Sequence, residues 1–266
     1  EVEALARQHG IRVDDSDEEH FCDTPELLQL YMRPIYNILR VLQEDDVHPC
    51  RGRVVMNYDF LKIAIEKEQF SCFHALLTNQ IFTEFMLRNM DCALKCTEMY
   101  FEHFEARKLQ MMYTSFNYVF YDGLINFYYM GQTGNTCYLE RGEMALSKMK
   151  EWLRHSDWNF KNKVLLMQAE YYRIMKDVNK AAICYEASIV AAMEHKFIHE
   201  EAMGNELAGL FHLELGSRQR SYSYLKQSIV CYRKWGAPAI VRRIESMIAN
   251  EFCMDIMQDL PKEIAI

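Results

Sequence analysis

From about residue 53 onward, apolar residues recur every three or four positions, the spacing that places them along one side of an α-helix. Leu, Met, Glu, Lys and Ala, which mostly favour helices, dominate these segments. Only ten glycines and five prolines interrupt the 266 residues. The pattern therefore predicts an all-α fold. The expected helices cover residues 68–87, 91–107, 110–130, 137–154, 160–176, 180–196, 199–215 and 220–235, and a last one begins near Pro238.

The first 52 residues follow a different pattern. The acidic run "DDSDEEH" at 14–20 indicates a solvated loop. The sequence "TPE" at 24–26 has the capping hydroxyl, first-turn proline and early acid of a helix start, and Pro34 is expected to kink or restart that helix. We therefore divide the chain into an acidic loop with capping helices (1–52) and helical repeats with a C-terminal capping helix (53–266).

The predicted helices form consecutive pairs that resemble one another. Ala169 and Ala181, one on each helix of a pair, lie twelve residues apart, and Tyr185 and Ser188 follow on the second helix. This spacing resembles the tetratricopeptide (TPR) pattern, in which small residues let two helices pack closely. A single pair cannot bury its own apolar side, so we expect a TPR-like α–α superhelix, a solenoid of antiparallel helix pairs. Small residues begin the second helix of each pair: Ala93, Gly142, Ala181 and Ser221.

Composition narrows the class of protein. The net charge is −8 and the basic residues are scattered, which argues against a nucleic-acid partner. No apolar run reaches the ~18–20 residues of a membrane span, and no signal peptide opens the chain. The nine cysteines are odd in number and irregularly spaced, so we expect free thiols in a reducing cytoplasm. Because the sequence starts at Glu1 rather than Met, we expect it to be part of a longer protein.

Two clusters could suggest a metal site. His195 and His199 have the spacing of the zinc motif H-E-x-x-H, but Lys, Phe and Ile stand between them, at the expected junction of two helices. Cys92 and Cys96 share a helix face, yet Cys72 lies about 25 Å before the intervening turn and Cys96 only about 10 Å after it, at ~1.5 Å of rise per residue. Zinc bonds of ~2.0–2.3 Å cannot bridge that difference. We expect no metal and no cofactor, with Cys92 and Cys96 as core thiols.

Two other stretches could form a ligand site. The loop "GQTGNT" at 131–136 lacks the Gly-Lys-Ser/Thr ending of a phosphate-binding loop. The aromatic series "YVFYDGLINFYY" at 118–129 could line a pocket, although aromatic residues on a buried helix are far commoner in a core. A ligand-binding or enzymatic helical domain, with a pocket among the aromatics of 110–130, is the alternative that this stretch leaves open.

Residues 156–245 carry a more specific pattern in "SDWNFKNKVLLMQAE", "YEASIVAAMEHKFIHEEAMGNELAGLFHLELG" and "YLKQSIVCYRKWGAPAIVRRIE". They resemble the TPR-like region of large multi-domain signalling ATPases, in which an AAA- or STAND-type ATPase accompanies protein-kinase, nucleotide-cyclase or histidine-kinase domains. One departure is Ile240-Val241, where that family usually has Lys-Val. The matching positions are Glu201, Ala202, Asn205, Glu206, Leu207, Ala208, Phe211, Leu213, Gly216, Tyr232, Trp235, Gly236 and Ala237.

The resemblance implies a helical fold with an interaction or regulatory role. No ATPase or kinase motif occurs in these 266 residues, so the resemblance transfers no enzymatic activity. The sequence thus predicts a non-catalytic scaffold that contacts a protein partner or flanking domains of the same chain.

In TPR-like solenoids the first helix of each pair lines the concave face. Taking Ala169 and Ala208 as packed positions, we place five residues on that face as a protein-binding surface: Lys163, Glu170, Arg173, Asn205 and His212. As surface positions, Lys163 and Arg173 should tolerate charge reversal at a cost of no more than about 0.5 kcal/mol each. Ala169, Ala181 and Ala208 should instead be buried between helices.

Overall fold

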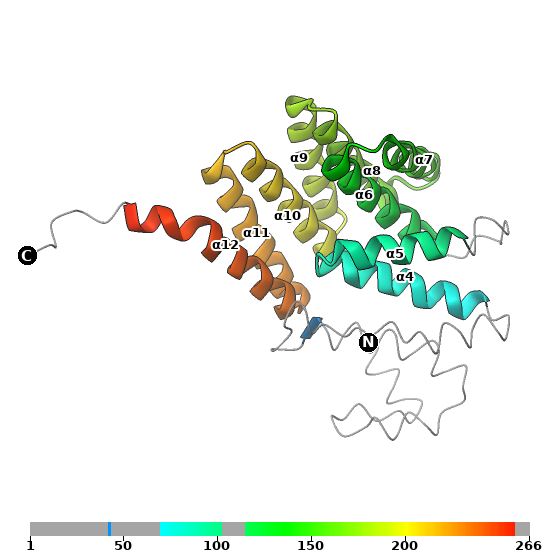
Figure 1. Cartoon of the computed structure of the whole chain (residues 1–266), viewed down its shortest axis with the longest axis horizontal. Helices are drawn as coiled ribbons and strands as arrows, with labels where there is room; N and C mark the ends of the chain where they lie inside the picture. Colours follow the sequence, from blue (N-terminus) through cyan, green and yellow to red (C-terminus); the bar gives the residue numbers. More distant parts are fainter. Residues whose placement is uncertain (1–41, 44–69, 103–114, 259–266) are drawn as a thin grey trace, which may run out of the picture.

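The computed structural model describes residues 42–43, 70–102 and 115–258, and within these ranges the chain contains helices and turns but no strand. The all-α prediction is therefore confirmed for the described residues. The expectations for the acidic run, the "TPE" helix start and Pro34 lie outside them. The helices, shown in Figure 1, are α4 (Phe70–Met86), α5 (Met90–Tyr100), α6 (Ser115–Thr133), α7 (Thr136–Leu153), α8 (Asp157–Ile174), α9 (Val178–Glu194), α10 (Ile198–Glu214), α11 (Arg218–Trp235) and α12 (Pro238–Gln258).

Consecutive helices pack as pairs. The most extensive contacts join α6 with α7, α8 with α9, and α10 with α11, and α4 packs against α5 in the same way. Each pair also contacts the next one, and α12 packs against α11. The first helices of neighbouring pairs touch directly, since α6 contacts both α4 and α8, and α8 contacts α10. The first helices of the pairs therefore lie next to one another along the stack.

Small residues lie where the helices of a pair meet, as the sequence predicts. Ala181 is fully buried, and Ala169 and Ala208 are buried as well. A Cβ atom added to Gly209 on α10 would lie 2.7 Å from Leu225 Cγ on α11, so a glycine is needed for the two helices to approach this closely. The other predicted small positions, Ala93, Gly142 and Ser221, are buried too.

One turn geometry recurs along the stack. After α4, α8, α9, α10 and α11 a residue adopts a positive φ, and the amide of the following residue donates to a carbonyl five positions earlier. Glycine suits this conformation because it has no Cβ, and Gly216 and Gly236 adopt it with φ of 72° and 86°. Lys176, Lys196 and Arg88 adopt it without that advantage, at φ of 61°, 63° and 63°.

The stack curves until its first described pair meets its last helices (Figure 1). Arg88, in the turn between α4 and α5, donates from Nε to Glu206 on α10 over 2.8 Å. Arg243 on α12 donates from Nη2 to the Met86 carbonyl at the end of α4 over 3.3 Å. Segments more than a hundred residues apart in the sequence are thus joined by charged side chains.

Candidate functional site

A pocket of about 530 Å³ opens between the first helices of the pairs and the final helix. Its wall is contributed by α4, the α4–α5 turn, α5, α6, α8, α10 and α12. Most of the lining is apolar, and six of the apolar residues are Phe85, Leu124, Tyr128, Leu210, Leu213 and Met247. The charged lining residues are Arg88, Glu170, Arg173, Glu214 and Arg243. Volume and apolar character match those of ordinary ligand pockets.

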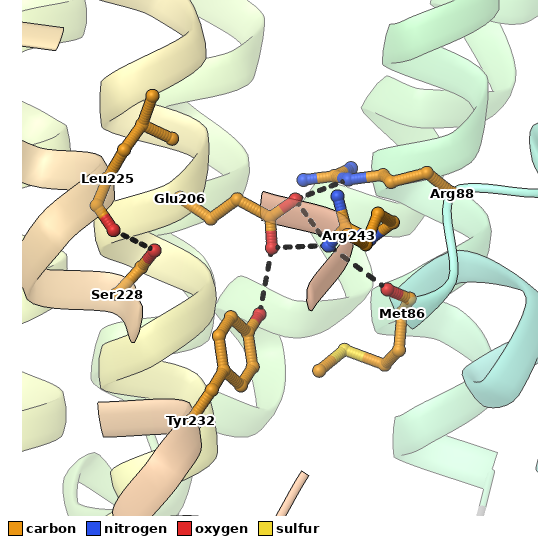
Figure 2. Close-up of polar contacts among 7 residues, drawn as sticks. All are labelled: Met86, Arg88, Glu206, Leu225, Ser228, Tyr232 and Arg243. Carbon is orange, nitrogen blue, oxygen red and sulfur yellow. Dashed lines mark hydrogen bonds and ion pairs between the residues drawn. The ribbon is translucent and has the colours of Figure 1, made fainter. Parts of the chain in front are cut away.

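One end of the pocket carries a buried carboxylate shared by two arginines (Figure 2). Glu206 Oε1 accepts from Arg88 Nε at 2.8 Å, and both Glu206 oxygens accept from Arg243 Nη2 at 2.9 Å. Tyr232, from α11, donates its hydroxyl to Glu206 Oε2 over 3.0 Å. Burial alone would raise the pKa of Glu206, but the guanidinium groups of Arg243 and Arg88 outweigh burial and hold the pKa at about 2. The glutamate is therefore ionised at neutral pH.

At the other end of the pocket, two carboxylates share one arginine. Arg173 Nε donates to Glu170 Oε2 over 2.9 Å, and its Nη1 donates to both carboxylate oxygens of Glu214, at 3.0 and 3.2 Å. Tyr185 donates its hydroxyl to the remaining oxygen of Glu170. The negative charge of Glu170 is the largest influence on Arg173 and raises the pKa of its guanidinium. Here one arginine stands between two carboxylates.

Of the five residues that the sequence places on a protein-binding face, only Glu170 and Arg173 line this pocket. Lys163 lies instead in a buried ion pair, with Nζ 2.6 Å from Glu200 Oε1 and the side chain only 6% exposed. Burial would raise the pKa of Glu200, yet the hydrogen bond from His199 and the charge of Lys163 hold the pKa at about 2. The prediction that Lys163 behaves as a surface charge is therefore wrong, because α10 covers it.

The two remaining residues are also buried. Asn205 donates from Nδ2 to the Glu201 carbonyl on its own helix over 2.9 Å. His212 stacks on Tyr224 of α11, with ring centroids 5.3 Å apart and planes 8° from parallel. Burial lowers the pKa of the His212 imidazole. His212 therefore helps to hold α10 against α11, Asn205 bonds within α10, and neither residue lines the pocket.

Sequence reasoning did not select Arg88, Arg243 or Glu206 as site residues. Glu206 and Tyr232 lie within the positions that carry the family resemblance, which was the one available signal for them. Arg88 belongs to a three-residue turn and Arg243 to the last helix, so no local periodicity connects either with α10. Only the curvature of the stack brings these residues together.

The histidine and cysteine clusters have structural places. His195 caps the C-terminus of α9 and stacks on Trp158 with ring centroids 4.3 Å apart, whereas His199 lies in the first turn of α10. Cys96 is buried, but Cys92 is exposed, contrary to the expectation of a core thiol. The buried residues of α5 are Met90, Ala93, Cys96, Thr97 and Tyr100. Cys92 is not among them, because it lies beside this buried side of the helix. Cys92, Cys137, Cys184 and Cys231 are free thiols.

The aromatic residues of α6 form part of the core. Tyr118, Phe120, Tyr121 and Phe127 are buried, as the commoner interpretation of this stretch predicts. Tyr128 is the aromatic residue of the described 115–130 segment that lines the pocket, next to Leu124. Residues 110–114 lie outside the described part of the chain.

No protein-family model, curated protein or solved structure matches this chain. None of the helices between residues 70 and 258 for which a position is described combines the length and apolar character needed to cross a membrane.

Proposed function

We propose that this chain is a non-catalytic, TPR-like helical-repeat scaffold that binds a protein segment on its concave face. Support comes from the paired helices, the small residues between them and the turn that recurs after five of the helices, which together suit a stacked superhelix. The free thiols of Cys92, Cys137, Cys184 and Cys231 are in keeping with a cytoplasmic setting. The partner is another protein or a domain flanking this region in a longer signalling protein.

The observation that carries the proposal is the pocket between the first helices. Apolar side chains that remain open to solvent in a concave site are typical of places where a ligand or peptide docks. The surrounding charges belong to four different elements, so the face can recognise charge as well as shape. Glu170 and Arg173 belong to this revised protein-binding surface, whereas Lys163, Asn205 and His212 support it from within.

The test uses two half-buried leucines that line the pocket, Leu210 and Leu213. Random ten-residue peptides displayed on phage are selected on the wild-type protein. Enriched peptides are then titrated by fluorescence anisotropy against wild type, Leu210→Gln/Leu213→Gln and the control Val230→Gln, whose side chain is exposed on α11. We expect at least a tenfold loss of affinity in the double variant and none in the control. Equal binding to all three proteins would remove the pocket as the binding surface.

A small ligand is the second candidate, favoured by the volume of about 530 Å³ and by the contributions of Leu124 and Tyr128 from the aromatic segment. A thermal-shift screen of small amphiphilic compounds distinguishes the two. Stabilisation of wild type but not of the double leucine variant by such a compound, together with no pocket-dependent peptide, would favour the small-ligand function.

A further inference from the structure

The charges at the Arg88 end of the pocket do not balance. Arg88 and Arg243 are both held by the single carboxylate of Glu206, which also accepts a hydrogen bond from Tyr232. Across the described residues, no second carboxylate pairs with either guanidinium. Because the pKa of Glu206 is held at about 2, this end keeps one positive charge in excess at neutral pH.

Hydrogen-bonding capacity is in excess there as well. Arg88 donates only from Nε, so its two Nη groups have no partner among the described residues. Arg243 donates only from Nη2, and its buried Nε has no hydrogen-bond partner within that same set. A guanidinium offers five N–H donors, in a fork that fits a carboxylate through two parallel bonds. Both side chains are 19% exposed, so they remain within reach of a molecule in the pocket.

The Arg173 end provides a contrast within the same pocket. There two carboxylates surround one guanidinium, and Arg173 bonds to both of them. The lining thus has a positive end at Arg88 and Arg243 and a negative end at Glu170 and Glu214, close enough for the charge of Glu170 to act on Arg88. An arrangement of this kind favours one orientation of a charged ligand over the reverse.

The backbone adds a second observation. Arg88 occupies the left-handed position of its turn at φ 63°, where Gly216 and Gly236 serve in the equivalent turns. A residue with a Cβ is disfavoured at such a position. Arg88 also lies over the Phe85 ring, with its guanidinium carbon 5.0 Å from the ring centroid. Arg88 thus lines the pocket from a backbone conformation that usually favours glycine.

From these observations we infer that the bound protein segment carries an acidic side chain, which inserts its carboxylate against Arg88 and Arg243 while neighbouring apolar side chains fill the pocket. This inference rests on the proposed function, since it names the chemistry of the segment that the concave face binds. The carboxylate compensates the excess charge and uses guanidinium N–H groups that are otherwise without a partner. Charge-assisted bonds of this kind are stronger than neutral ones.

The experiment changes the ligand first and the protein second. Each phage-selected peptide that depends on the leucine pair is resynthesised with its Asp or Glu residues replaced singly by Asn or Gln, and titrated against the wild-type chain. One acidic position should account for at least a tenfold loss of affinity. In Arg243→Gln, the same replacement should cost less than threefold, because Glu206 then balances Arg88 and the excess positive charge that the acid compensates is gone. Arg218→Gln on α11, outside the pocket, is the matched control and should preserve the tenfold loss.

The outcomes separate the inference from the function on which it rests. Pocket-dependent peptides that keep their affinity within twofold after every acid-to-amide change overturn the carboxylate while the proposed function stands. Failure to enrich any pocket-dependent peptide overturns both. Self-association of the chain that is abolished by Leu210→Gln/Leu213→Gln, measured by sedimentation, would identify a second copy as the occupant and also overturn the inference. If circular dichroism shows that the Arg243→Gln variant is unfolded, the acid-to-amide replacements in the peptides, titrated against the wild-type chain, decide whether the inference holds.

Discussion

Replacing Glu206 with glutamine tests whether the charged cluster joins the two ends of the stack. The amide has nearly the same shape as the carboxylate but no charge. Arg88 and Arg243 would then face each other without a counter-ion, and Tyr232 would lose a charged acceptor. The described contact between the α4–α5 turn and α10 would be left to neutral and apolar interactions.

Glu206→Gln should lower the free energy of unfolding by about 3 kcal/mol. The pKa of Glu206 is held at about 2 instead of 4.5, and each tenfold change in proton affinity corresponds to about 1.4 kcal/mol, so the ionised form gains about 3 kcal/mol. Removing one partner of a buried ion pair typically costs about 3–5 kcal/mol. Because the arginine side chains are 19% exposed, we expect the lower end, about 3 kcal/mol.

Urea unfolding followed by circular dichroism at pH 7 measures this difference. Glu214→Gln is the control, since that carboxylate is half exposed and a surface pair contributes about 0–1 kcal/mol. The pH dependence gives a second readout. A carboxylate with a lowered folded-state pKa stabilises the fold above its unfolded pKa of 4.5, and the effect disappears as pH falls toward 2. The gap between wild type and Glu206→Gln should therefore narrow over that range. A gap at pH 7 no larger than that of Glu214→Gln would refute the reasoning.

Three further substitutions test the packing and the turns by the same urea assay. Lys163→Glu should lower the free energy of unfolding by at least about 3 kcal/mol, because it places a second carboxylate beside the buried Glu200. Lys161→Glu, at an exposed position, should cost less than about 1 kcal/mol. Similar losses in the two variants would contradict the buried ion pair. Ala181→Leu should lose about 1–3 kcal/mol by overpacking α8 against α9, and an unchanged midpoint would argue against that contact. Lys176→Gly should raise stability by about 0.5–1 kcal/mol by relieving its left-handed conformation, and a loss would show that the lysine side chain matters more than its backbone.

Local features of the fold could be predicted from the sequence. Apolar periodicity depends only on residues three and four apart, so it placed α8 to α11 within about three residues of their ends. The expected helices 199–215 and 220–235 end directly before Gly216 and Gly236, and both glycines adopt a positive φ, which costs glycine no steric strain. Ala181 marked a close helix contact because a small residue on each helix recurs with the tetratricopeptide spacing.

The same local patterns could not assign charged residues to the surface or to the interior. The spacing of Lys163 from the apolar residues of its helix predicts a solvent-exposed side chain. In the structure α10 covers Lys163 and supplies Glu200 as its partner. A charged residue is buried only if another element provides the opposite charge, and that element is 37 residues further along the chain. The sequence therefore predicted an accessible lysine where the structure has a buried ion pair.

The pocket depends on still longer distances. Arg88 and Glu206 are separated by 118 residues, and Met86 and Arg243 by 157. Their approach depends on how successive helix pairs pack against one another, which has no counterpart in the spacing of any one helix. The sequence by itself determined the helices, their pairing and several of their turns, because those features arise from neighbours along the chain. Only the tertiary structure decided which charges meet, since that depends on contacts between helices far apart in the sequence.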